Sequence, residues 1–359
     1  MIRSILGAVA AALALAAPAN AMDDPGAVYA LSNAVSGNAV LVYDRAADGT
    51  IAYAGSYATG GLGSGDGLGS QGAVTVSGSG RFVLAVNAGS NSISSFVVRP
   101  SGLELRDVEA SGGIRPTSVA ERNGLVYALN AGVPNSISGF RLEAQGELTP
   151  IAGSTRPLAA AQTTPSQIAI SPERNAIVVT ERATNSIMTW TVDADGAPAA
   201  AQLFASGGAG PFGFAFGHRG VFVVSDAAGA SGASSYRLGQ DGSVETITPL
   251  VPSMRRAACW TVVTKDGRFA YVTNGGTGDV TALRIDQDGS IALRTPSGVD
   301  ATVGGAAVDA AVSANSRFLY VRNGMLGKVD AFRIGGDGSL TWVGAVNGLP
   351  ASAAGLAAS

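Results

Sequence analysis

The chain contains 359 residues, of which 46% are hydrophobic and 14% charged, and its formal net charge is −3. The charged fraction lies well below the roughly 25% of an ordinary globular domain. No long basic run is present, which argues against a nucleic-acid partner. A single cysteine excludes an internal disulfide, and with a single histidine it excludes the usual zinc clusters, so we expect no metal and no cofactor.

The N-terminal segment has the three parts of a secretory signal peptide. A basic start precedes an apolar stretch over residues 5–17, and small residues lead up to Ala21. The apolar stretch is shorter than the about 20 residues that a membrane-spanning helix needs. We therefore predict a signal peptide over residues 1–21. The mature protein, residues 22–359, is expected to be periplasmic or secreted and not inserted in a membrane.

The mature chain repeats one pattern seven times. In each repeat an apolar, β-rich segment ends in Asn, Asp or Glu, and a turn and further apolar segments follow. The seven end positions, spaced by 43 to 54 residues, are Asn33, Asn87, Asn130, Glu181, Asp226, Asn274 and Asn323. A strand-built repeat of roughly 40–50 residues is typical of propeller blades. We predict an all-β, single-domain, seven-bladed β-propeller with four antiparallel strands per blade.

One repeat shows how a blade is built. Residues 166–171 are predicted as an inner strand, residues 176–181 as a second and residues 186–192 as a third, before an Asp-Gly hairpin leads to the fourth. Asp-Gly suits a type I′ turn because both central residues need a positive φ. We therefore interpret the aspartates of these hairpins as turn residues: Asp48, Asp195, Asp241, Asp288 and Asp337.

The two ends of the mature chain complement each other. The first apolar segment, residues 28–33, corresponds to a second strand and lacks an inner strand before it. Residues 349–359 resemble an inner strand with nothing after it. We predict that this C-terminal strand completes the first blade and closes the ring, which covers edges that would otherwise stay open.

The strand order also predicts a site. Inner strands begin and second strands end on one side of the ring, which we call the top face, and propeller ligands usually enter there beside the central channel. Three carboxylates are candidate catalytic groups that could activate water: Asp226, Glu181 and Asp309. Seven residues are candidate ligand-binding groups: Arg115, Gln167, Arg182, Arg255, Arg256, Trp260 and Arg322. The arginines suit a carboxylate or phosphate, although any one of them could instead bridge blades or face solvent.

Three further features are interpreted as structural. His218 falls in a turn on the opposite, bottom face, which argues against a Ser-His-Asp triad. Cys259 is interpreted as a packing residue. Residues 67–72 match the dinucleotide-binding G-x-G-x-x-G pattern, but a strand and not a helix follows, so we interpret the match as chance. The surrounding segment, residues 60–72, is the longest irregular connection and is predicted to act as a mobile lid.

Several repeat phrases resemble a known family. The phrases at residues 165–172, 265–274 and 316–323 are similar to those of lactonase-type seven-bladed propellers, which include bacterial 6-phosphogluconolactonase and fungal carboxymuconate-lactonizing enzymes. The resemblance covers essentially the whole mature chain and implies lactone chemistry. Its enzymes carry a Pro-Arg-His at an inner strand, a Glu at the end of the next strand and an Asn-Arg-Gly one blade later. Here residues 210–213 lack the Arg and His, Asp226 replaces the Glu, and the Arg after Asn274 is absent.

Two functions stay open at this stage. The first is a secreted lactone or ester hydrolase, in which a carboxylate activates water and arginines stabilise the oxyanion. The second is a non-catalytic propeller that binds a small ligand, a glycan or a protein on its top face. In either case we expect a monomer whose ligand at the channel mouth is a small anion or a lactone.

Overall fold

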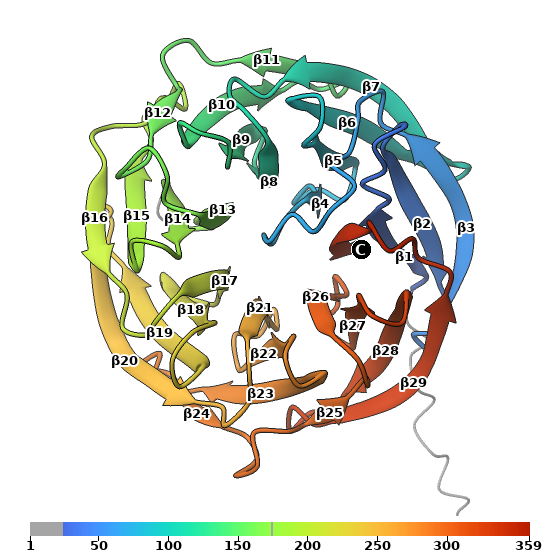
Figure 1. The fold of residues 1–359 in the computed structure, drawn as a ribbon, viewed down its shortest axis with the longest axis vertical. Coiled ribbons are helices and arrows are strands. Elements are labelled where there is room, and N and C mark those ends of the chain that lie inside the picture. The colour runs from blue at the N-terminus through green and yellow to red at the C-terminus, as the bar shows by residue number, and fades with distance from the viewer. Residues whose placement is uncertain (1–23, 174) are drawn as a thin grey trace, which may run out of the picture.

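The computed structural model describes residues 24–173 and 175–359, and the predicted signal peptide lies outside this range. The described residues form thirty strands in seven antiparallel sheets arranged around a central axis (Figure 1). The predicted seven-bladed β-propeller is therefore confirmed. Within the described residues, no helix has the length and apolar character needed to cross a membrane.

Each blade consists of an inner, a second, a third and an outer strand. The inner strands are β4 (Val74–Val76), β8 (Pro116–Arg122), β13 (Pro165–Ile170), β17 (Pro211–Phe216), β21 (Ala258–Val263), β26 (Ala307–Val312) and β30 (Ala354–Ala358). The second strands are β1 (Gly26–Leu31), β5 (Phe82–Asn87), β9 (Leu125–Asn130), β14 (Ala176–Glu181), β18 (Val221–Asp226), β22 (Phe269–Asn274) and β27 (Phe318–Asn323).

The third and outer strands lie farther from the axis. The third strands are β2 (Ala39–Arg45), β6 (Ser92–Arg99), β10 (Ser136–Leu142), β15 (Ser186–Thr191), β19 (Gly232–Leu238), β23 (Asp279–Ile285) and β28 (Lys328–Ile334). The outer strands are β3 (Ile51–Ala58), β7 (Gly102–Ala110), β11 (Leu148–Pro150) with β12 (Arg156–Pro157), β16 (Gln202–Ala205), β20 (Val244–Pro252), β24 (Ile291–Leu293) with β25 (Ala301–Thr302), and β29 (Leu340–Asn347). Blade 1 combines β30 with β1, β2 and β3, and blades 2 to 7 follow in chain order.

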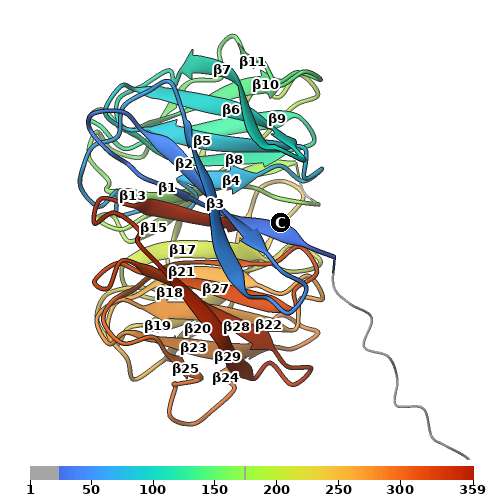
Figure 2. The same ribbon diagram turned by 90° about the vertical axis from the view of Figure 1, so that its right-hand side faces the viewer.

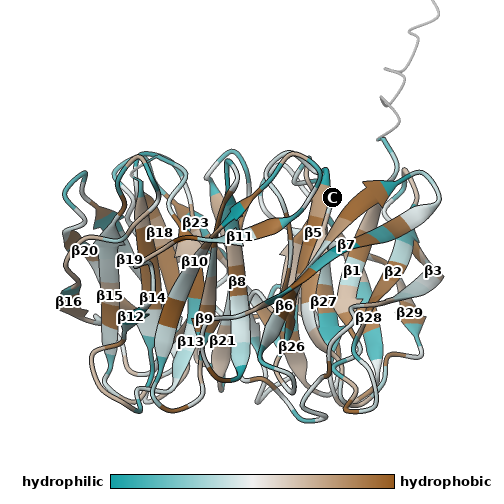
Figure 3. Ribbon diagram, turned by 90° about the horizontal axis from the view of Figure 1, so that it is seen from above, coloured by the Kyte–Doolittle hydropathy of each residue, from teal (hydrophilic) through white to brown (hydrophobic). Residues whose placement is uncertain are grey.

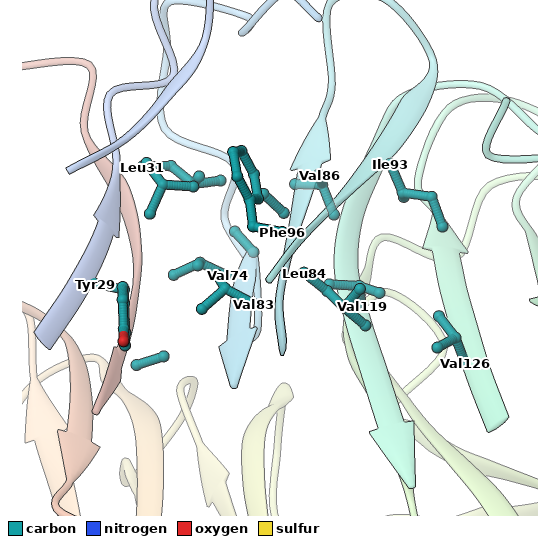
Figure 4. Packing of buried hydrophobic residues seen from close by; sticks show 14 of the residues in the cluster. Tyr29, Leu31, Val74, Val83, Leu84, Val86, Ile93, Phe96, Val119 and Val126 are labelled. Atoms are coloured by element: carbon teal, nitrogen blue, oxygen red, sulfur yellow. The ribbon is translucent and has the colours of Figure 1, made fainter. Parts of the chain in front are cut away.

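The second strands are buried on both faces because each lies between two neighbouring blades. All six residues of β5, β14, β18 and β22 are buried, which explains why these segments read as nearly continuous apolar runs. Figure 4 shows one such interface, where Leu31, Val74 and Phe96 from blades 1 and 2 pack together. The hydrophobic residues gather along the strands, and hydrophilic residues concentrate in the turns at the two faces (Figure 3).

The C-terminal strand closes the ring as predicted. β30 pairs antiparallel with β1, with Ala357 opposite Tyr29 and Ala354 opposite Leu31, and the red C-terminal strand lies beside the dark blue β1 (Figures 1 and 2). Beyond the strand, the Ser359 N–H donates to the Ala27 carbonyl at 2.9 Å. The first blade therefore contains segments from both ends of the described chain.

The Asp-Gly hairpins join two strands of one blade and accept hydrogen bonds from the neighbouring blade. The glycines of these turns have positive φ values, for example 91° at Gly49 and 80° at Gly338, but the aspartates before them do not. The type I′ expectation is therefore wrong, because that turn needs a positive φ at both central residues. Each hairpin is instead a type I turn followed by a left-handed glycine, and the Gly49 N–H donates to the Ala46 carbonyl. The carbonyls of three of these five glycines accept hydrogen bonds from tyrosines of the preceding blade. Three such bonds are present: Tyr320 to Gly49 at 3.1 Å, Tyr127 to Gly196 at 2.6 Å and Tyr271 to Gly338 at 3.0 Å. The hairpin glycines thus have a structural role.

Candidate functional site

The segment predicted as a lid runs into the mouth of the central channel. Residues 60–72 connect β3 to β4 and reach from blade 2 toward the axis of the ring (Figure 1). The Gln71 amide donates to the Thr261 carbonyl at 2.7 Å and accepts from the Thr261 N–H at 2.9 Å. The Gln71 backbone N–H donates to the Ser166 carbonyl at 3.0 Å. We call residues 69–72 the plug, because they bond to inner strands on the far side of the channel.

The plug is also held by its other residues. The Ser70 hydroxyl donates to the Thr117 carbonyl at 2.7 Å, so the plug reaches blades 3, 4 and 6. A Cβ on Gly213 of blade 5 would lie 2.0 Å from the Gln71 side-chain oxygen and 2.7 Å from the Cys259 carbonyl. Only glycine leaves room for the plug at this point.

An arginine and two aromatic rings lie against the plug. The Arg182 guanidinium lies over the Phe212 ring, 4.8 Å from its centroid, and Phe212 packs edge-on against Trp260 at 5.0 Å. Arg182 Nη2 donates to the Gly69 carbonyl at 3.2 Å, and Trp260 Nε1 donates to the Ser70 carbonyl at 2.9 Å. Two donors from different blades therefore hold successive carbonyl oxygens of the plug.

Arg182 is a cation without a carboxylate partner among the described residues. Its Nε is buried and has no hydrogen-bond partner. Burial lowers the pKa of the Arg182 guanidinium from its usual value, because a desolvated cation is less stable than a hydrated one. The Phe212 ring offsets part of this cost through its negative face. The position is electrostatically suited to an anion.

Asp309 and Arg322 form a second charged group, which we call the seam pair. Asp309 lies in a bulge of β26, its φ is 75° and its side chain is 1% exposed. Arg322 lies on the same face of β27 as Phe318 and Tyr320, which pack against blade 1 at the junction where the ring closes. One polar atom of each member, Asp309 Oδ2 and Arg322 Nε, is buried without a hydrogen-bond partner in the described protein.

The electrostatics of the seam pair are unusual. Burial raises the pKa of the Asp309 carboxyl to about 7, and the Arg322 charge opposes this rise. Burial lowers the pKa of the Arg322 guanidinium, and Asp309 opposes that change. No hydrogen bond or ion pair joins the two side chains in the described protein. Buried polar atoms of this kind are usually satisfied by an ordered water or a ligand.

The other two candidate catalytic carboxylates are enclosed within their own blades. Glu181 accepts hydrogen bonds from Thr184 at 3.1 Å and Ser186 at 3.0 Å, and Asp226 accepts one from Ser234. Both side chains are 0% exposed. Burial raises the pKa of Asp226 to about 7, although its bonds to Ser234 and Ser206 oppose this.

The same position in other blades explains these contacts. In five blades the polar residue that ends the second strand bonds to side chains at the start of the third strand. Asn87 donates to Ser94 at 2.7 Å, and Asn274 donates to Thr281 at 2.9 Å. Glu181 and Asp226 thus take the place that asparagines hold in the other repeats.

The remaining candidate ligand-binding residues contact the protein itself. Gln167 exchanges two hydrogen bonds with the Phe214 backbone of the next blade, as Gln71 does with Thr261. The other three contacts are Arg115 with Asp66 at 3.4 Å, Arg255 Nε with Asp279 at 2.9 Å, and Arg256 with the Gly276 carbonyl at 3.2 Å. Of the seven candidates, the structure brings Arg182 and Trp260 together against the plug.

The sequence patterns missed several residues of the top face. The patterns do not predict a role for Ser70, Gln71 or Phe212, although these residues fall in the glycine-rich segment and in the phrase at residues 210–213. Exposed apolar side chains also gather in the top-face connections: Val35, Leu62, Ile114, Val133, Met254, Met325 and Leu326.

His218 lies on the bottom face, where it lines a cavity of about 320 Å³ with Asp266 and Arg268. The described residues contain no cluster of three or more His, Cys, Asp or Glu that could hold a metal ion.

Comparison with known proteins supports the family expected from the repeats. Residues 133–249 match the family model described as "Lactonase, 7-bladed beta-propeller". The resemblance to lactonase-type propellers is confirmed. No curated protein sequence matches this chain.

Solved structures resemble the whole described ring. The periplasmic gluconolactonase of Pseudomonas aeruginosa has a TM-score of 0.75 and 16% identity, covering 93% of this chain and 98% of that one. Two proteins provisionally named 6-phosphogluconolactonases are similar as well. The Bacteroides uniformis protein has a TM-score of 0.72, 18% identity and coverages of 92% and 99%, and the Bacteroides fragilis protein has 0.71, 17%, 93% and 98%. At these identities the likeness establishes the fold alone.

Proposed function

We propose that this lactonase-type propeller hydrolyses a small anionic lactone at the seam pair. The observation that carries the proposal is the combination of Asp309 and Arg322: a buried carboxyl on left-handed backbone, and a neighbouring guanidinium, each with an unpartnered polar atom. Left-handed backbone costs a non-glycine residue roughly 1–2 kcal/mol, and such strain concentrates at functional sites. Carboxyl groups with a pKa near neutrality suit general acid–base catalysis.

The proposed reaction divides the work between the two side chains. The Asp309 carboxylate takes a proton from water while the water oxygen bonds to the lactone carbonyl carbon. Arg322 stabilises the negative charge that develops on the carbonyl oxygen. The ring carbon–oxygen bond then breaks, and the departing oxygen takes the proton back from Asp309. The product is the open hydroxy acid.

Hydrolysis of a panel of anionic and neutral lactones tests this function. Wild-type protein is expected to turn over at least one lactone, and Asp309→Asn should lower kcat/KM by about 10²-fold or more, as loss of a general base does. Asp330→Asn is the matched control, because Asp330 is a buried aspartate of the same blade that pairs with Lys328. Folded wild-type protein that hydrolyses no lactone, or an Asp309→Asn variant with full activity, would contradict the proposal.

We also propose that the protein is exported. The basic start and apolar stretch of residues 1–21 support this, and one structural neighbour is described as periplasmic. Expression of the full chain in a bacterial host should yield mature protein in the periplasmic fraction that begins at Met22. N-terminal sequencing of that fraction measures the cleavage point, and an intact N-terminus in the cytoplasm would argue against export.

A second candidate function is a non-catalytic binding module. The plug in the channel mouth and the exposed apolar residues of the top-face connections favour it. The same lactone panel separates the two functions. A binding module would bind hydroxy-carboxylates, as measured by calorimetry, without hydrolysing any of the lactones.

A further inference from the structure

The contacts between Arg182, Trp260 and the plug resemble those of a bound ligand. Arg182 Nη2 and Trp260 Nε1 donate to the carbonyl oxygens of Gly69 and Ser70, which belong to neighbouring peptide units. Two donors from different blades thus bond to the carbonyl oxygens of successive residues. Hydrogen bonding of this kind also suits the two oxygens of a carboxylate.

The plug satisfies only part of what Arg182 requires. A peptide carbonyl carries a partial charge, whereas the buried guanidinium carries a full one and has no carboxylate near it in the described protein. An uncompensated, partly buried cation is unfavourable. A carboxylate in the place of the Gly69 carbonyl would neutralise this charge and would form a stronger, charge-assisted hydrogen bond.

The plug is built from residues that permit such a displacement. Seven of the thirteen residues from 60 to 72 are glycine. The outer part of the segment is anchored, since the Asn33 amide donates to the Asp66 carbonyl at 2.7 Å. Gly67 follows directly, and a Cβ there would meet no atom within 4 Å. The glycines leave the backbone able to adopt other conformations between the anchor at Asp66 and the strand β4.

We propose that the plug occupies a carboxylate subsite formed by Arg182 and Trp260, and that a carboxylate-bearing ligand binds there by displacing the plug. The inference rests on the proposed function in one respect, that the ligand is an anion. It adds the chemical class of that anion and a conformational step before binding. Ligand affinity then depends on how firmly the plug is held.

The Gln71 side chain provides the most direct test of this dependence. Its amide exchanges two hydrogen bonds with Thr261 and contacts neither Arg182 nor Trp260 through a hydrogen bond. Gln71→Leu removes both bonds without adding charge. Gln202→Leu is the matched control, because it removes one glutamine amide bond, to the Asp241 carbonyl at 2.7 Å, in an outer strand.

The experiment measures binding of sodium gluconate, a hydroxy-carboxylate, by calorimetry. Gln71→Leu is expected to bind gluconate about tenfold or more tightly than wild type, because less interaction opposes plug displacement. Gln202→Leu should bind like wild type, and Arg182→Gln should lose binding. Weaker binding by folded Gln71→Leu, or unchanged binding by Arg182→Gln, would overturn the proposal. Binding of inorganic phosphate but not gluconate through Arg182 would overturn the carboxylate assignment.

Hydrogen exchange of wild-type protein tests the same step without a variant. The plug amides, including the Gln71 N–H bonded to Ser166, should exchange faster when gluconate is bound. Slower exchange would show that the ligand binds over a fixed plug and would overturn the displacement. These outcomes are independent of the lactone panel, since hydrolysis at Asp309 can fail while gluconate still displaces the plug, and the reverse.

Discussion

Asp226 differs from the asparagine of most repeats by one group, a carboxylate oxygen in place of the amide nitrogen. It stands where the repeats mostly carry asparagine, is 0% exposed and accepts a hydrogen bond from Ser234 of its own blade. A neutral group fits this enclosed place better than a charged one. The raised pKa of Asp226, about 7, has this cause. The protonation of Asp226 is therefore coupled to the free energy of unfolding.

Asp226→Asn is expected to stabilise the protein in alkaline solution. The pKa of Asp226 is raised in the folded state, so its stabilising protonated form is complete below the unfolded pKa and is lost as pH rises through about 7. Three pKa units correspond to at most about 4 kcal/mol in the free energy of unfolding. Urea unfolding at pH 5 and pH 9 measures the effect.

The difference between variant and wild type isolates Asp226, because Asp309 titrates in the same range in both proteins. The variant should gain more stability relative to wild type at pH 9 than at pH 5, because the loss in wild type begins above the unfolded pKa and is complete above about 7. An equal stability difference at both pH values would show that Asp226 does not titrate in this range.

The seam pair makes a separate prediction for the pH dependence of hydrolysis. Asp309 must be deprotonated to accept a proton from water, and its pKa is raised to about 7 by burial. For wild-type protein kcat/KM should therefore rise as pH increases through about 7 and then level off. A profile that is flat between pH 5 and 9 would remove Asp309 from the role of general base.

At the scale of elements, the plug depends on the absence of a side chain at Gly213. An added Cβ would lie 2.0 Å from the Gln71 oxygen and 2.7 Å from the Cys259 carbonyl. Gly213→Ala should therefore shift the plug and lower the free energy of unfolding by about 1–3 kcal/mol. Thermal unfolding and exchange of the Gln71 amide measure the two effects.

Gly336→Ala is the control for this substitution. No heavy atom lies within 4 Å of the position that its Cβ would take, and its φ is not positive. The control should unfold like wild type. Equal stability of Gly213→Ala and wild type would mean that the plug is not packed against β17.

Strands and turns were predictable because each repeat carries its own local signal. The end positions of the second strands and the Asp-Gly hairpins fixed the blades, and all seven were found in the structure. The plug was not predictable, since its partners Ser166 and Thr261 are about 95 and 190 residues away in sequence and follow no period. Glu181 and Asp226 stand where five repeats carry asparagine. This position indicates the hydrogen bonds that both side chains make within the blade, whereas their charge alone does not.

At the scale of the molecule, the ring depends on one strand from the end of the chain. β30 covers the edge of β1 and packs beside β26 and β4. Deletion of residues 349–359 should expose this edge and destabilise all seven blades together, because each blade is buried by its neighbours. Circular dichroism and size-exclusion chromatography should show loss of cooperative unfolding and aggregation.

A synthetic peptide of residues 349–359 provides the control for this deletion. Added in excess, it should pair with β1 and restore a cooperative transition, whereas a scrambled peptide should not. A truncated protein that unfolds cooperatively at the wild-type temperature would show that the ring does not need its closing strand.

The plug also bears on how a ligand enters and leaves the central channel. The Gln71 side chain is bonded to Thr261 of blade 6 and its backbone N–H to Ser166 of blade 4, so it links inner strands on different sides of the channel. We expect substrate to enter and product to leave on the top face, so a product that dissociates slowly excludes the next substrate from the site. We therefore expect the reaction product to inhibit hydrolysis competitively.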